Sequence, residues 1–205
     1  MRGRTNSVTT SGGSSESPLK KLIDGRHNTW YLFFKFNGTA VDDIIHYDDT
    51  ENATDTYYMF YNCPNLITIP NLNTSKVTIM TGMFYGCQRL QTLPMLDTSK
   101  VTNMDNILHN CYHVNEIPAW DVSNVTSWSN SFNTCRNLRA VHMIGAKISF
   151  RISASTYFTA EALQEIINNL GTVTKTQSLT MGSTNLAKVS EEYVTIATNK
   201  GWTLA

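Results

Sequence analysis

The chain has 205 residues and carries 16 basic and 16 acidic side chains, so its formal net charge is zero. A nucleic-acid-binding protein usually has a basic excess, and this balance argues against that class. Hydrophobic residues make up 41% of the chain, which is enough for a buried core. No apolar run approaches the roughly 18 residues that a membrane-spanning helix needs. We therefore expect neither a nucleic-acid partner nor insertion into a membrane.

The first segment, residues 1–17, is rich in serine, threonine and glycine and contains no aromatic residue. This composition is typical of a flexible arm, which either has no function or docks into a larger assembly. The segment also lacks the apolar stretch of a secretory signal peptide. The residues that follow are expected to cap one end of the folded part, through Leu19, Leu22, Ile23, Trp30 and Leu32.

A strict internal repeat dominates the middle of the chain. The cysteines show it first, because Cys63, Cys87, Cys111 and Cys135 are evenly spaced. Independent cysteines would not keep such a period, whose length lies in the range of known repeat proteins. Other apolar columns repeat with it: Phe60, Phe84, Leu108 and Phe132; Leu66, Leu90, Val114 and Leu138; Ile69, Leu93, Ile117 and Val141; Leu72, Leu96, Trp120 and Ile144; Val77, Val101 and Val125; and Met80, Met104 and Trp128.

Polar columns separate the apolar ones and predict turns. Pro70, Pro94 and Pro118 follow the first apolar stretch of each repeat. Proline lacks an amide donor and therefore fits where a strand ends. Asn73, Asp97 and Asp121 then precede Ser75, Ser99 and Ser123 by two positions. Such side chains bond nearby backbone amides and make turns. The segment 80–85 is expected to form a single helical turn on the far side.

These columns predict an α/β repeat solenoid. One repeat cannot bury its own apolar side, but stacked repeats share a continuous core. We expect a leucine-rich-repeat-like, right-handed coil with a parallel sheet on one side and short helices or turns on the other. Residues 18–145 would form the solenoid, an N-terminal cap followed by about four to five coils, with weaker copies of the repeat at 36–49 and 49–60.

The last part, residues 146–205, is expected to be a helical C-terminal cap, because a solenoid needs a polar lid over its last coil. Residues 155–171 predict a helix from an N-cap at Thr159 to a C-cap at Gly171. Its apolar face is made of Ala162, Leu163, Ile166, Ile167 and Leu170. A second helix is predicted from Ser190 to Gly201, followed by a short strand at 202–205. Between the helices, Leu179, Met181, Asn185 and Leu186 resemble a leucine-rich-repeat strand and its asparagine turn.

Segments such as LPMLDTSKVTNMDNILHNC at 93–111 and MFYGCQRLQTLP at 83–94 resemble the BspA-type leucine-rich repeats. Proteins with these repeats are common on the surface of gut and oral bacteria and in their bacteriophages. The resemblance covers about residues 30–205 and implies adhesion or recognition. The family shares no catalytic residues, so the resemblance implies a non-enzymatic protein with no cofactor.

Few well-formed repeats and no visible leader or anchoring signal favour a virion-associated bacteriophage protein over a cell-wall protein. We expect it to recognise a glycan or protein of the host cell surface. The first alternative is a structural decoration protein of the capsid or tail, docked on other virion proteins through the N-terminal arm. The second is a bacterial cell-surface adhesin. Exposed edges at the ends of the coil would also permit homo-oligomers.

The residues that resemble reactive or metal-binding groups have simpler interpretations. Zinc sites usually pair cysteines at short spacing, so we expect buried free thiols. His109 and His113 flank Cys111 but belong to columns that face solvent, so no metal is expected. The glycosylation triplets at Asn37, Asn52, Asn73 and Asn124 are read chiefly as turn chemistry, the last three lying in the repeat's turn segment. Asp42 and Asp43 have no identifiable catalytic partner.

Columns beside the predicted strand keep no apolar identity, and we predict a ligand-binding surface there, called the strand face. Tyrosine offers area with a polar tip, and amides give directed hydrogen bonds. The alternative is a solvated strand side without a ligand. The strand face consists of Gln88, Arg89, Gln91, Tyr112, His113, Asn115, Arg136 and Arg139.

Overall fold

A computed structural model describes residues 53–69 and 71–205. The expected arm at 1–17, the expected cap residues at 19–32 and the weak repeat at 36–49 lie outside the described residues. The elements, in order, are β1 (Glu116–Ile117), β2 (Ala140–Val141), β3 (Phe150–Arg151), α1 (Ala160–Asn169), β4 (Gln177–Thr180), α2 (Ser183–Leu186), α3 (Glu191–Asn199) and β5 (Trp202–Leu204). β1 pairs with β2, and β3, β4 and β5 form a second sheet in that order; every pairing is parallel.

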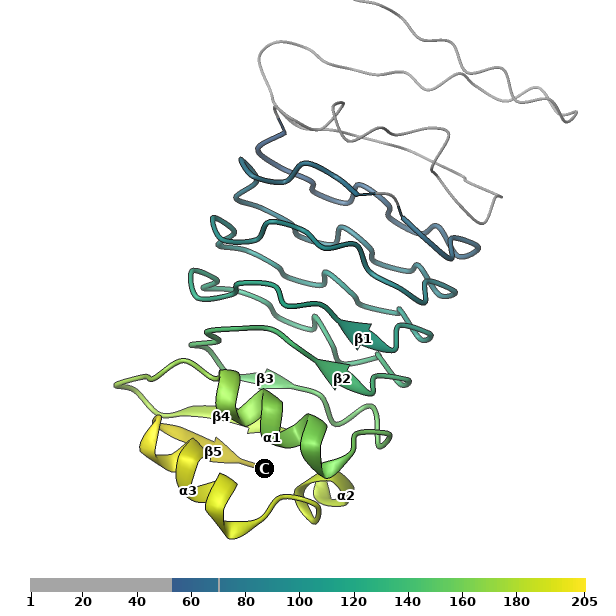
Figure 1. Cartoon of the computed structure of the whole chain (residues 1–205). Helices are drawn as coiled ribbons and strands as arrows, with labels where there is room; N and C mark the ends of the chain where they lie inside the picture. The colour runs from purple at the N-terminus through teal and green to yellow at the C-terminus, as the bar shows by residue number, and fades with distance from the viewer. Residues whose placement is uncertain (1–52, 70) are drawn as a thin grey trace, which may run out of the picture.

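Before the capping part, the chain runs in successive coils that lie one above another (Figure 1). Parallel bridges join Asp55 to Ile79, Ile79 to Asn103, and Asn103 to Ser127, which are equivalent positions of consecutive repeats. On another side of the coils the amide of Asn115 donates to the carbonyl of Gln91 (3.4 Å), and that of Arg139 to the carbonyl of Asn115 (2.7 Å). Residues that are paired between neighbouring coils are therefore one sequence repeat apart.

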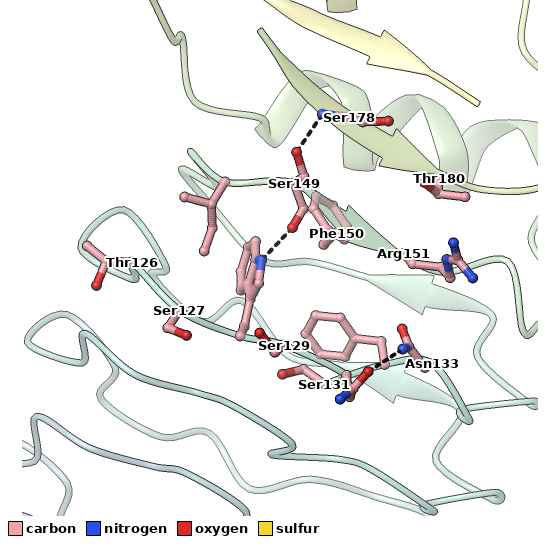
Figure 2. A pocket seen from close by; sticks show the side chains of 14 residues that line it. Thr126, Ser127, Ser129, Ser131, Asn133, Ser149, Phe150, Arg151, Ser178 and Thr180 are labelled. Carbon is pink, nitrogen blue, oxygen red and sulfur yellow. Dashed lines mark hydrogen bonds between the residues drawn. The ribbon is translucent and has the colours of Figure 1, made fainter. Parts of the chain in front are cut away.

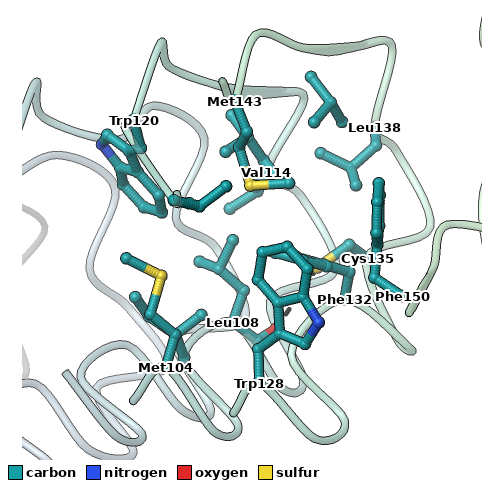
Figure 3. Packing of buried hydrophobic residues seen from close by; sticks show 14 of the residues in the cluster. Met104, Leu108, Val114, Trp120, Trp128, Phe132, Cys135, Leu138, Met143 and Phe150 are labelled. Atoms are coloured by element: carbon teal, nitrogen blue, oxygen red, sulfur yellow. Dashed lines mark hydrogen bonds between the residues drawn. The ribbon is translucent and has the colours of Figure 1, made fainter. Parts of the chain in front are cut away.

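The repeated apolar side chains point into the interior that the stacked coils enclose, as the sequence predicts (Figure 3). The columns of Phe84, Leu90, Val101 and Met104 are buried throughout the described coils. The rings of Phe60 and Phe84 stack with their centroids 5.8 Å apart. Ile69 and Leu93 are partly buried against this core.

One predicted core position is wrong. The sequence predicts that Ile144 continues the column of Trp120, but Ile144 is 50% exposed. The bridge from Asp121 to Ile144 is one position shorter than the bridges of the preceding coils. Met143 is buried instead, because the shorter coil moves every later residue forward by one position.

The far side of each coil is also different from the expected helical turn at 80–85. The chain makes tight turns there, and single residues within them adopt the left-handed conformation, with φ of +60° at Gly82 and +76° at Gly86. The left-handed positions repeat at Tyr58, Asn106 and Asn130, and at Asn62 and Asn110. Glycine and asparagine favour this conformation, which a helical turn cannot contain.

The cysteine column forms hydrogen bonds inside the core, because its thiols donate to backbone carbonyls. The thiol of Cys87 donates to the carbonyl of Phe60 (3.1 Å), that of Cys111 to Phe84 (3.0 Å), and that of Cys135 to Leu108 (3.4 Å). Each acceptor lies in the preceding coil. All four cysteines are buried, and none forms a disulfide bond within the described residues. A small side chain with a weak donor therefore fits this column better than a purely apolar one.

This burial makes stability depend on alkaline pH. Burial raises the pKa of the Cys111 thiol from 9.0 to about 12. In the window between these values the unfolded chain releases this proton while the folded chain retains it, so the free energy of unfolding falls as the pH rises. Between neutral pH and about pH 10, we expect the wild type to lose about 1 kcal/mol more than Cys111→Ala. Urea unfolding of both proteins at the two pH values measures this; equal losses would contradict it.

The capping part has three helices where the sequence predicts two, because α2 forms at the position of the predicted asparagine turn. The two predicted helices, α1 and α3, follow their predicted boundaries closely. Thr159 caps α1, because its hydroxyl accepts a hydrogen bond from the amide of Ala162 (3.2 Å). The C-cap is Leu170 and not Gly171, and Lys200 donates to the carbonyls of Ile167, Asn168 and Leu170 at this end. Ser190 precedes α3, although its side chain makes no capping bond. Within residues 53–69 and 71–205, every helix is too short or too polar to cross a bilayer.

Candidate ligand-binding face

The structure places the strand face on the outside of the coils. Its residues are exposed except Tyr112, which is half-buried. Gln91, Asn115 and Arg139 lie in register on successive coils because their backbones are hydrogen-bonded to one another. The inward neighbours of these residues, including Leu90, Val114 and Leu138, are fully buried. The repeat thus holds the exposed side chains on a rigid support.

Aromatic rings hold two of the arginines. The guanidinium of Arg136 lies 5.4 Å from the ring centre of Tyr112, and that of Arg139 lies 5.4 Å from the ring centre of Tyr157. Both are cation–π contacts between different coils or segments. A guanidinium fixed in this way presents its N–H groups for planar recognition of an acceptor. Sequence reasoning missed Tyr157, which is 57% exposed, because it lies outside the repeat period.

His113 and Gln88 connect one pair of coils, as Arg136 and Tyr112 connect the next pair. The ring Nδ1 of His113 lies 2.7 Å from the carbonyl oxygen of Gln88. Arg89 is exposed beside Gln88. The structure therefore brings the predicted residues together as one surface built from three coils, without enclosing them in a cavity.

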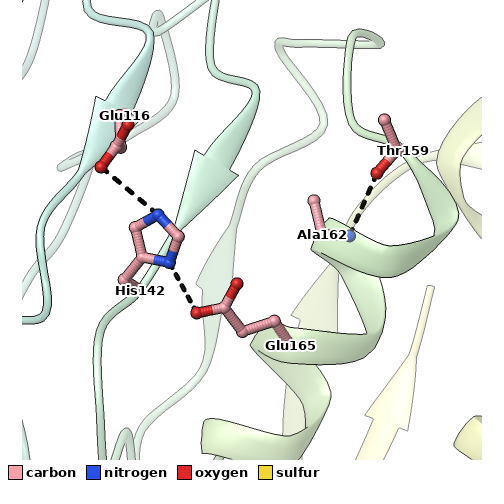
Figure 4. Close-up of polar contacts among 5 residues, drawn as sticks. All are labelled: Glu116, His142, Thr159, Ala162 and Glu165. Carbon is pink, nitrogen blue, oxygen red and sulfur yellow. Dashed lines mark hydrogen bonds and ion pairs between the residues drawn. The ribbon is translucent and has the colours of Figure 1, made fainter.

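An imidazole between two carboxylates lies beside this surface (Figure 4). His142 follows β2, and its Nδ1 lies 2.5 Å from an oxygen of Glu165 in α1. Its Nε2 lies 3.4 Å from an oxygen of Glu116 in β1. When the ring is protonated it donates to both carboxylates and links the sheet to the capping helix. No sequence motif indicated this group, because Glu165 has no place in the repeat.

The remaining sequence candidates have structural contacts. His109 packs on the ring of Tyr85, with centroids 4.9 Å apart, and is half-buried. The side-chain oxygen of Asn73 accepts from the amide and the hydroxyl of Ser75, which is the predicted turn. Asn124 donates from its amide to the carbonyl of Ser99 (2.8 Å). Asn37, Asp42, Asp43 and Asn52 lie outside the described residues. In the described part of the chain, no group of three or more histidines, cysteines or acids is arranged to hold a metal ion.

Comparison with known proteins gives a family for this chain. The model of a family described as "Mycoplasma protein of unknown function, DUF285" matches residues 28–144. This match covers more than half of the chain, and it ends at Ile144, where the coil shortens. No curated protein and no solved structure matches the chain. The chain belongs to the DUF285 family.

Proposed function

We propose that this protein is a non-enzymatic binding module that recognises a glycan or protein of a bacterial cell surface through the strand face. The observation that carries the proposal is the contrast between columns. Inward columns stay apolar from coil to coil, while the outward positions carry arginine, tyrosine and amide side chains held in register. Surfaces of this composition suit the hydroxyl and carbonyl groups of a glycan or a protein face.

We further propose that the coils form a right-handed, BspA-type leucine-rich-repeat solenoid, closed by residues 146–205. The parallel bridges between equivalent positions of consecutive repeats support this, as does the relation of the DUF285 family to BspA-like repeat proteins. In such an architecture each coil contacts its neighbours, and the outer surface is free for recognition.

The protein is proposed to act on a bacteriophage particle, where many copies would compensate for weak binding at each site. The alternatives are a decoration protein that docks on other virion proteins through residues 1–17, and an adhesin on a bacterial surface. A decoration protein would bind particle proteins and no cells. An adhesin would bind cells, as a phage recognition protein would. The neighbouring genes are therefore needed to distinguish these two candidates.

The direct test is binding of the labelled full chain, as a monomer and displayed multivalently, to intact gut and oral bacteria. A strand-face variant would carry Arg89→Ser, Arg136→Ser and Arg139→Ser. Its matched control would carry Lys100→Ser, Lys147→Ser and Lys175→Ser, the same loss of charge at exposed positions elsewhere. Truncation of arginines that dominate the binding energy at the centre of an interface lowers the affinity by about tenfold or more.

We expect saturable binding by the wild type and the control, and its loss in the strand-face variant. Equal binding by both variants would locate the binding surface elsewhere. Failure of every form to bind any strain, including the multivalent one, would favour the decoration protein.

A further inference from the structure

On the side of the coils that carries the left-handed turns, the backbone hydrogen bonds from one coil to the next end at Trp128. In the preceding coils, the amide of Met80 donates to Asn103 and that of Met104 to Ser127, at 2.8 Å each. One turn further, Gly82 donates to Asp105 (2.7 Å) and Asn106 to Ser129 (2.9 Å). The equivalent amides of Trp128 and Asn130 make no hydrogen bond to any described residue.

The backbone edge at residues 128–130 presents only amide donors to the next coil. An ordinary strand edge would present alternating donors and acceptors. The carbonyls of Ser127 and Ser129 accept from the coil before them, and the carbonyl of Trp128 accepts from Ser131 within its own coil. This one-sided arrangement follows from the left-handed residue Asn130, with φ of +58°. The amide of Ser129, between those of Trp128 and Asn130, points to Asp105 on the opposite edge, so Trp128 and Asn130 leave two unpaired donors on one edge. Unpaired amides at the edge of a sheet can form a concavity that binds anions.

Trp128 explains why the next coil does not close this edge. It stands in the column of Met80 and Met104, but its indole is larger and its Nε1 donates to the carbonyl of Ser149 (2.8 Å). The ring also packs against Phe150, with centroids 5.2 Å apart. The side chain therefore makes the contact that the backbone makes in earlier coils, and the two backbones diverge.

A hollow of about 330 Å³ lies at this divergence, and we call it the terminal pocket. It is lined by 126–133 on one side and by 148–151, Ser178 and Thr180 on the other (Figure 2). The lining contains one charged side chain, Arg151, and no acid. Arg151 is exposed and forms no ion pair with a described residue. The nearby carboxylate of Asp105 is bonded to the hydroxyl of Ser127 and the amide of Ser129 on the opposite edge of the coil.

We propose that the terminal pocket binds an oxyanion, either the carboxylate of an acidic sugar or a sulfate or phosphate group. The amides of Trp128 and Asn130 donate to its oxygens, and Arg151 supplies the opposite charge. An added peptide strand fits less well, because it needs acceptors as well as donors along the edge. This site is independent of the strand face, and its affinity is expected to be weak, with dissociation constants of about 1 mM or more.

The test is an NMR titration of the ¹⁵N-labelled full chain with sodium sulfate, sodium phosphate, D-glucuronate and D-glucose, each against sodium chloride at equal ionic strength. The amides of Trp128 and Asn130 should shift saturably with at least one oxyanion, while the paired amides of Met104 and Asn106 stay in place. A response to glucuronate alone identifies a carboxylate ligand, and a response to sulfate or phosphate alone identifies a tetrahedral anion.

The matched variants are Arg151→Gln and Arg139→Gln, which make the same change in the terminal pocket and on the strand face. Arg151→Gln should weaken oxyanion binding by about fivefold, and Arg139→Gln should leave it unchanged. Equal shifts with chloride or with glucose, no saturation, or unchanged affinity in Arg151→Gln would each overturn the proposal. Arg139→Gln changes the strand face and not the terminal pocket. This variant therefore separates the test of oxyanion binding from the test of cell binding.

Discussion

Replacing Phe84 with alanine is expected to lower the free energy of unfolding by about 3–5 kcal/mol. Phe84 is fully buried in the middle of the described coils, and its ring stacks on Phe60. Its loss leaves a cavity that faces the coils on both sides, and each coil is supported by its neighbours. Chemical denaturation followed by circular dichroism measures the change.

Met95→Ala is the control for this substitution, because Met95 belongs to the same coil and is 61% exposed. Exposed substitutions of this kind usually change stability by less than about 0.5 kcal/mol. A cost below about 1 kcal/mol for Phe84→Ala would mean that this column is not a packed core.

Asn185→Ala is expected to destabilise the capping part by about 3 kcal/mol, since it leaves two buried acceptors unpaired. Asn185 is fully buried, and its amide donates to the carbonyl of Ser155 (2.7 Å) and to that of Met181 (2.9 Å). These bonds fix the turn after β4 to the loop before α1. The measurement is the unfolding midpoint together with the dispersion of amide signals from 177–205.

Asn168→Ala serves as its control, because Asn168 is exposed in α1 and alanine is the better helix former. We expect the control to be neutral or slightly stabilising. If both alanine variants unfolded at the same denaturant concentration, the buried amide of Asn185 would have no structural role.

The repeated columns were predictable because identical spacing forces equivalent residues into equivalent environments. That logic identified the buried column of Val101, the turn at Asn73 and the register of Gln91 with Asn115. It failed at Ile144, because the coil that ends there is shorter by one position, and the columns of the earlier coils give no sign of this. It also missed Tyr157 and Glu165, which reach the outer surface from segments without a repeat.

The left-handed turns have a sequence signal that the apolar pattern hides. Gly82 and Gly86 lie four positions apart, and asparagine replaces both in the next repeat, at Asn106 and Asn110. Glycine exchanged for asparagine is the usual sign of positive φ. The apolar residues of the segment 80–85 lie at short intervals that favour a helical turn, and only its glycine argues against one. The terminal pocket depends on this geometry and so was beyond the sequence reasoning.

Amide hydrogen exchange of the full chain tests the central claim, that hydrogen bonds join each coil to the equivalent positions of the next. The amides of Met80, Gly82 and Phe84 should be protected, because they donate to the next coil. Trp128 and Asn130, at the same positions of the last coil, should exchange far faster. Fast exchange at all of these positions would show that the coils are not joined, and would contradict the account.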